Sequence, residues 1–123
     1  MRALLHVLSF CFCLAALTLA LESDALAQAP RANSPEECAT YADLALVATT
    51  LAKHGVPRPD TEAMLPDLYA FATPEALEIA HRVLEVAYRV AAARGAPRMF
   101  AEALGRSCLS RGGDLSQALG VRL

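Results

Sequence analysis

Apolar side chains recur every three or four positions along most of the chain that follows residue 33, which is the spacing of one face of an α-helix. Four stretches carry this pattern, at about 35–54, 60–71, 74–94 and 97–110. No stretch alternates apolar and polar residues as a half-buried strand would. The pattern therefore predicts an all-α fold, a small four-helix bundle with orthogonal or irregular packing.

Residues that begin or end helices bound these stretches. Ser34-Pro35-Glu36-Glu37 has the pattern of a capping box with proline in the first turn, and Thr73-Pro74-Glu75 repeats its cap and proline. Gly55 ends the first stretch, because glycine accepts a left-handed turn. Asp60 is expected to cap the second stretch, and Pro66 lies deep enough inside it to remove one hydrogen bond. The second helix is therefore predicted to be short and kinked.

The N-terminal segment has the pattern of a cleavable signal peptide. Arg2 gives one positive charge, and residues 3–21 contain no charged side chain. Ala25 and Ala27 place small residues at the positions that signal peptidase recognises, so we predict that residues 1–27 are removed. Cleavage after Ala29 ranks second because Pro30 would follow the scissile bond. The alternative is a membrane anchor formed by uncleaved residues 3–21, a stretch nearly long enough to span a bilayer.

The rest of the chain is long enough for one compact domain. Residues 28–33 carry no helical pattern and are expected to form a flexible lead, followed by a helical domain at 34–110. The pair Gly112-Gly113 indicates a break in the chain. We therefore expect residues 111–123 to be a flexible C-terminal tail.

Two of the four cysteines remain after the predicted cleavage. Cys38 and Cys108 lie 70 positions apart, near the two ends of the helical region, in a chain predicted to reach an oxidising compartment. A disulfide between them would close the bundle and stabilise it by about 4 kcal/mol through the loop it closes. No second cysteine or His-x-x-x-His pair lies nearby to complete a zinc site, so no metal site is expected.

Charge is divided unevenly along the mature chain. Residues 28–80 carry three basic and eight acidic side chains, for a net charge of −5, and residues 81–123 carry seven basic and three acidic ones, for +4. The two halves should attract each other within one subunit, between two copies, or toward a charged partner. The overall balance is close to neutral, and this argues against binding to nucleic acid.

No group of residues in the mature chain has the pattern of a catalytic or cofactor site. His54 and His81 lie on different predicted helices, with no carboxylate at ligand spacing. The serines lack a nucleophile motif, and the chain has no phosphate-binding loop, no Cys-x-x-Cys pair and no haem attachment motif. We therefore expect no catalytic residue, no cofactor and no enzymatic activity.

The strongest candidates for contact with a partner lie in and after the loop at 54–60. Its two prolines stiffen the chain and hold Arg58 outward, and the kinked helix that follows carries Tyr69 and Phe71. These features favour a periplasmic or secreted protein that acts by protein–protein binding. The partner is expected to be an unknown envelope protein or a second copy, with no stable membrane insertion after signal cleavage.

Two other functions share the same gross features. In architecture, though in no particular motif, the mature chain resembles the small periplasmic helical chaperones that carry one disulfide, so an acid-stress chaperone is one alternative. Those chaperones depend on dense titratable charge and on lysine, whereas Lys53 is the only lysine of this chain. The second alternative is an immunity or inhibitor protein directed against an envelope-acting toxin.

Overall fold

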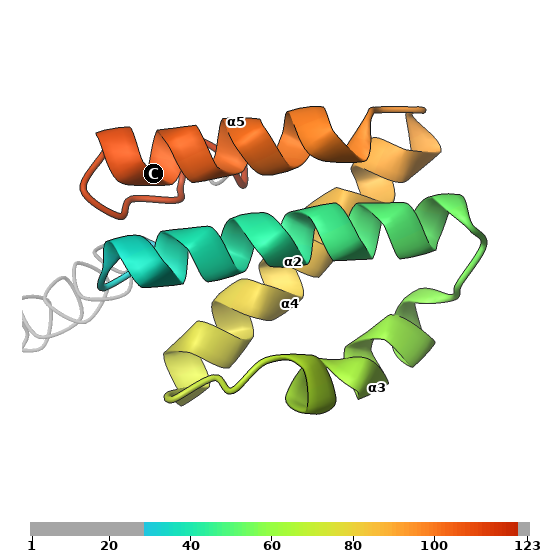
Figure 1. Cartoon of the computed structure of the whole chain (residues 1–123), viewed down its shortest axis with the longest axis horizontal. Helices are drawn as coiled ribbons and strands as arrows, with labels where there is room; N and C mark the ends of the chain where they lie inside the picture. The colour runs from blue at the N-terminus through green and yellow to red at the C-terminus, as the bar shows by residue number, and fades with distance from the viewer. Residues whose placement is uncertain (1–28, 121–123) are drawn as a thin grey trace, which may run out of the picture. The chain divides into compact units, whose positions relative to one another are not determined.

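The computed structural model describes residues 29–120. Its helices are α2 (Pro35–Lys53), α3 (Arg58–Leu68), α4 (Pro74–Ala92) and α5 (Pro97–Ser110) (Figure 1). Between residues 29 and 120 there is no strand, only an isolated bridge between Arg31 and Asp114. The predicted all-α, four-helix fold is thus confirmed. The predicted signal peptide at 1–27 lies outside the described residues.

Local capping explains where α2 and α4 begin. The Ser34 hydroxyl accepts a hydrogen bond from the Glu37 N–H at 3.1 Å, and the Thr73 hydroxyl accepts one from the Ala76 N–H at 3.1 Å. Both bonds satisfy backbone donors that the first turn of a helix leaves free. The carboxylate of Glu37 in turn accepts a hydrogen bond from the Asn33 N–H at 2.6 Å, which holds the chain that enters α2.

The second helix differs from its prediction at both ends. α3 begins at Arg58, and Pro57 is its N-cap residue without a side-chain hydrogen bond, so the predicted cap at Asp60 is wrong. Two prolines at the entry make this start possible, because proline has no N–H to satisfy in a first turn. Pro66 lies in the last turn, and the helix ends at Leu68 rather than near residue 71.

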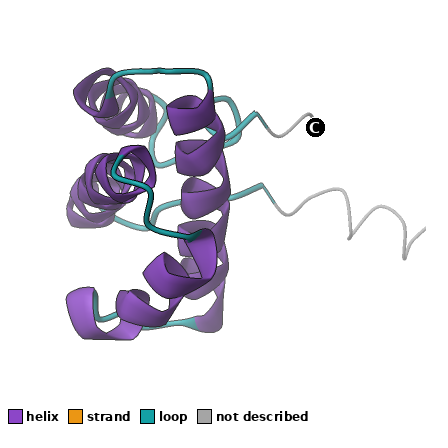
Figure 2. Cartoon of the chain, turned by 90° about the vertical axis from the view of Figure 1, so that its right-hand side faces the viewer, coloured by secondary structure: helices purple, strands orange, loops and turns teal. Residues whose placement is uncertain are grey.

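α2 and α5 run antiparallel side by side (Figure 1). The Cys38–Cys108 disulfide joins the beginning of α2 to the end of α5, with Cα atoms 5.7 Å apart. At the opposite end, the Lys53 ammonium donates a hydrogen bond to the Gly95 carbonyl at 3.2 Å. Figure 2 shows α2 and α5 nearly end-on, with α4 running across their direction. The bundle therefore has the irregular packing that was predicted.

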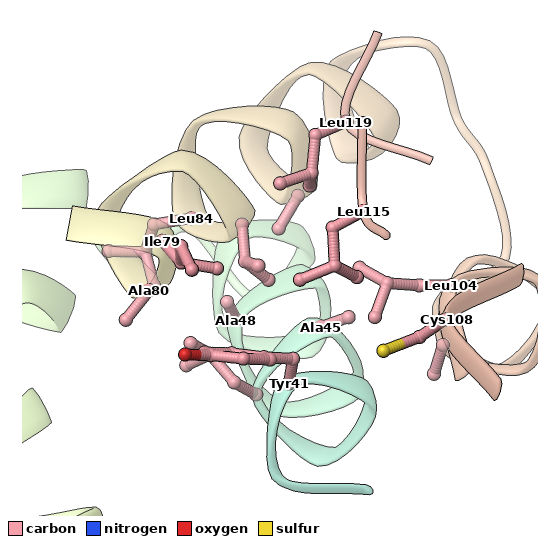
Figure 3. Close-up of a cluster of buried hydrophobic side chains, with 14 of the residues drawn as sticks. Tyr41, Ala45, Ala48, Ile79, Ala80, Leu84, Leu104, Cys108, Leu115 and Leu119 are labelled. Carbon is pink, nitrogen blue, oxygen red and sulfur yellow. The ribbon is translucent and has the colours of Figure 1, made fainter. Parts of the chain in front are cut away.

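The hydrophobic core lies between α2, α4, α5 and the segment that follows α5 (Figure 3). Its fully buried large side chains include Tyr41, Leu44, Val83, Leu84, Leu104 and Leu115. Leu119, 5% exposed, comes from the same C-terminal segment as Leu115. The core is thus closed on one side by residues outside the four helices.

This packing corrects the expectation of a flexible lead and a flexible tail for the described parts of both segments. The Leu115 N–H donates to the Pro30 carbonyl at 2.9 Å, and the Ala32 N–H donates to the Gly113 carbonyl at 2.8 Å. Ala32 and Leu115 are both buried. We call this pairing of residues 30–33 with residues 112–116 the terminal clasp. Gly113, at φ +94°, turns the chain back toward the lead, so the glycine pair forms an ordered turn.

Candidate functional site

The three residues predicted to contact a partner do not form one surface. Arg58 lies at the beginning of α3, where its Nε donates to Glu62 Oε1 at 2.9 Å. Tyr69 and Phe71 follow the other end of the same 11-residue helix, a rise of about 16 Å away. Arg58 is thus separated from the two aromatic residues by the length of α3.

Tyr69 and Phe71 cover one edge of the core. The two rings lie 5.8 Å apart between centroids, and Phe71 stacks on the buried Tyr41 at 6.5 Å. The Tyr69 hydroxyl donates to Asp43 Oδ2 at 2.6 Å, which ties the segment after α3 to α2. Burial, and secondly the bond to the Asp43 carboxylate, raises the pKa of Tyr69. Burial also raises the pKa of Tyr41 to about 12, with a smaller effect from the Glu37 charge.

The two histidines of the described chain lie in different places. His54 is exposed at the C-terminal cap of α2. His81 lies on α4 with its Nδ1 3.8 Å from Glu62 Oε1, the same oxygen that Arg58 contacts. These three side chains form a half-buried polar cluster between α3 and α4. In residues 29–120 no group of three histidine, cysteine, aspartate or glutamate side chains is placed to hold a metal ion.

The disulfide predicted from the sequence is confirmed. Cys38 and Cys108 are bonded at 2.03 Å, and both residues are buried, with 2% and 0% of their surface exposed. The bond joins α2 to α5, and a groove lies between these two helices on the outer face of the bundle.

An apolar groove runs between α2 and α5 on the side away from the core. It has a volume of about 450 Å³ and is open to solvent along its length. Its lining residues are Pro35, Cys38, Ala39, Ala42, Asp43 and Leu46 from α2, and Arg98, Ala101, Glu102, Gly105 and Leu109 from α5. We call this surface the α2/α5 groove.

Two leucines form the large walls of the α2/α5 groove, and small residues form its floor. Leu46 is 38% exposed and Leu109 is 59% exposed. The helices approach closely at Ala42 and Gly105, where a Cβ placed on the glycine would lie 3.2 Å from the Ala42 Cβ. The sequence pattern does not reveal this groove, because its two sides come from helices far apart in the chain. The one sequence feature that points to the groove is a leucine on the polar side of each helix, Leu46 on α2 and Leu109 on α5.

The ion pairs among the described residues lie on α3 and α4. The predicted i,i+4 pairs on α4 are present, with Arg82–Glu78 at 3.6 Å and Arg89–Glu85 at 3.7 Å. Among the described residues, however, no ion pair joins the acidic α2 to the basic α5. The attraction predicted between the two halves of the chain is therefore not expressed as ion pairs between these two helices.

The fold and the groove together define a small disulfide-bonded α-helical domain with an exposed apolar surface between two antiparallel helices. None of the helices between residues 29 and 120 has the length and apolar character needed to cross a membrane. Comparison of the chain with models of protein families, with curated proteins and with solved structures gave no match.

Proposed function

We propose that this is an exported protein whose helical domain acts by binding helical protein surfaces in the α2/α5 groove. The observation that carries the proposal is the groove itself, in which Leu46 and Leu109 are exposed beside a floor of small residues. Leaving two leucines and a continuous apolar floor in contact with water costs free energy that a bound partner would recover.

Export is supported by the sequence of residues 1–27 and by the disulfide. A charged N-terminus, an uncharged apolar segment and small residues before the predicted cleavage site are the three parts of a signal peptide. Disulfides persist in oxidising compartments and are rare where glutathione keeps thiols reduced. The Cys38–Cys108 bond is consistent with a protein that functions outside the cytoplasm.

The shape of the groove favours a protein ligand over a small molecule. Small-molecule sites enclose most of the ligand surface and place a few polar groups toward it. Here the cavity is an open trough between two helices, and its polar side chains, Asp43, Arg98 and Glu102, lie beside an aliphatic floor. An amphipathic helix laid in such a trough presents apolar side chains at i, i+3, i+4 and i+7.

Site-specific photo-crosslinking in the native organism tests this proposal. A photoreactive amino acid is placed at Leu109, in the groove, or at Leu68, which is 52% exposed on α3 and serves as the control. We expect discrete protein adducts from position 109 and none from position 68. Leu46→Glu, introduced together with the probe at 109, should remove the adducts while the far-UV circular dichroism of the protein stays unchanged. Equal adducts at both positions, or adducts that survive Leu46→Glu, would contradict the proposal.

A further inference from the structure

We infer that the partner in the α2/α5 groove is a second copy of this chain, in a symmetric dimer with α2 of each copy on α5 of the other. The inference rests on the proposed function, because it names the occupant of the same groove. It is carried by the internal symmetry of the groove and by the charges on its two helices.

The groove repeats the same arrangement from its two sides. Leu46 comes four positions after Ala42 on α2, and Leu109 comes four positions after Gly105 on α5. Because the helices are antiparallel and approach at Ala42 and Gly105, each leucine lies about 6 Å from this point in opposite directions. The groove thus has one leucine on each side of the approach point, on opposite walls.

A small residue lies across from each leucine. In the antiparallel register set by Ala42 and Gly105, Leu46 is level with Ala101 and Leu109 is level with Cys38, and all four residues line the groove. Each half of the groove therefore has a projection on one wall and a depression on the other. When a second copy faces this surface, its leucines fit over Ala101 and Cys38 in the way that knobs fit into holes. A two-fold interface requires such a self-complementary surface.

The charges beside the approach point select one of the two possible two-fold arrangements. Asp43 follows Ala42, and Arg106 follows Gly105, so the repeated positions carry opposite charges. A two-fold axis parallel to the helices places α2 on the partner's α5 and brings Asp43 to the partner's Arg106 twice. An axis perpendicular to the helices would place Asp43 on the partner's Asp43 and Arg106 on the partner's Arg106. Like charges disfavour the second arrangement.

The net charges of the whole helices favour the same arrangement. α2 contains three acidic residues and one basic one, whereas α5 contains two basic residues and one acidic one. No described ion pair links α2 to α5 within the subunit, so these opposite charges do not neutralise each other there, although Asp43 accepts a hydrogen bond from the Tyr69 hydroxyl. Opposite net charges on facing helices increase the rate of encounter and fix the orientation of the pair.

The size of the groove sets the expected affinity. From Pro35 to Leu46 the α2 side spans about 17 Å, so the contact belongs to the small interfaces that bury less than about 1,200 Å² in total. Interfaces of this size are weak or transient. We therefore expect a dimer with a dissociation constant in the micromolar range or above, which forms as the protein is concentrated.

Sedimentation velocity of the oxidised mature protein, residues 28–123, tests the dimer. Across concentrations from about 1 to about 500 μM, the wild type should shift from monomer to dimer. Leu109→Lys should stay monomeric over that range, because it places a charge over the apolar surface at the partner's Cys38. Leu68→Lys, on α3 outside the groove, should dimerise as the wild type does. Circular dichroism of each variant verifies that it is folded.

A charge-exchange experiment tests the arrangement of the helices. Asp43→Arg alone and Arg106→Glu alone each place like charges at both contacts, and each should weaken dimerisation by roughly tenfold. An equimolar mixture of the two variants should recover dimers, because both contacts then join opposite charges. Tyr69→Phe is the control for the hydrogen bond that Asp43→Arg removes, and it should leave dimerisation unchanged.

Three results would overturn the inference: a wild type that stays monomeric, a Leu109→Lys variant that dimerises, or single charge variants that dimerise as strongly as the wild type. The crosslinking experiment distinguishes a failure of the dimer model from a failure of the proposed binding function. A monomeric wild type whose probe at 109 still forms position-specific adducts with a different protein would disprove the dimer and retain the groove as a binding site. Adducts with twice the mass of the chain support both proposals, and adducts that do not depend on position defeat both.

Discussion

Replacing Leu115 by alanine tests whether the C-terminal segment is part of the core. Leu115 is fully buried, and it reaches into the space between α2, α4 and α5 (Figure 3). Its backbone N–H is held by the Pro30 carbonyl at 2.9 Å. The chain around the site is therefore fixed and can move little to fill a cavity left by the missing side-chain atoms.

The expected cost follows from this burial. Leucine-to-alanine changes at fully buried sites cost about 3–5 kcal/mol, and more where the surroundings cannot relax. We expect about 3 kcal/mol for Leu115→Ala. A domain of this size has a total stability of about 5–10 kcal/mol, so the variant should lose a third or more of it. The midpoint of thermal unfolding should fall by about 15 °C.

Urea and thermal unfolding followed by circular dichroism at 222 nm measure this cost. Leu68→Ala makes the same change at a side chain that is 52% exposed, and it should cost less than about 0.5 kcal/mol. Deletion of residues 114–123, which also removes Leu119 and half of the terminal clasp, should leave little folded protein. If Leu115→Ala lay within about 1 kcal/mol of the wild type, the assignment of this segment to the core would be wrong.

Three further predictions address the disulfide, the clasp and the tyrosines. Cys38→Ser should lower the free energy of unfolding by about 4 kcal/mol and leave one thiol that reacts with Ellman's reagent only after unfolding; a wild-type stability in denaturant would contradict this. Gly113→Ala should destabilise the domain, because Gly113 has φ +94° and a Cβ there would collide with the Ala32 carbonyl; a melting temperature equal to that of the wild type would refute the clasp geometry. The pKa of Tyr41 is raised from 10.0 to about 12, and that of Tyr69 is also raised, so the folded state disfavours ionisation of both tyrosines. The stability present below pH 10 should therefore be lost between about pH 10 and 12. Unfolding free energies that stay constant over this range would exclude the effect.

The parts of the fold that depend on local signals were predictable from the sequence. Ser34 and Thr73 each cap a helix by accepting a hydrogen bond from the N–H three positions further on, so short sequence motifs indicate where α2 and α4 begin. The pairing of Cys38 with Cys108 was predictable because these are the two cysteines outside the predicted signal peptide. The beginning of α3 was missed because its proline-rich entry needs no side-chain cap, a case in which the usual signal is absent.

The parts that depend on distant contacts were not predictable in this way. Leu115 follows two glycines, and only its pairing with Pro30, 85 positions earlier, shows that it is buried. Tyr69 and Phe71 were expected to face a partner, but each finds a neighbour inside the domain, Asp43 or Tyr41. The α2/α5 groove depends on how α2 and α5 are aligned with each other, and the periodic pattern within either helix does not determine that alignment.

The terminal clasp and the disulfide lie next to each other where the chain enters and leaves the domain. The bond joins residues 38 and 108, only a few positions inside the clasp on each side. A pulling force applied to the two ends of the chain would open the clasp first and would then be carried by the covalent bond. The segment between Cys38 and Cys108 would bear none of the load. A molecule under tension would therefore lengthen only at its flanks, and most of α2, all of α3 and α4 and the part of the groove between residues 38 and 108 would keep their shape.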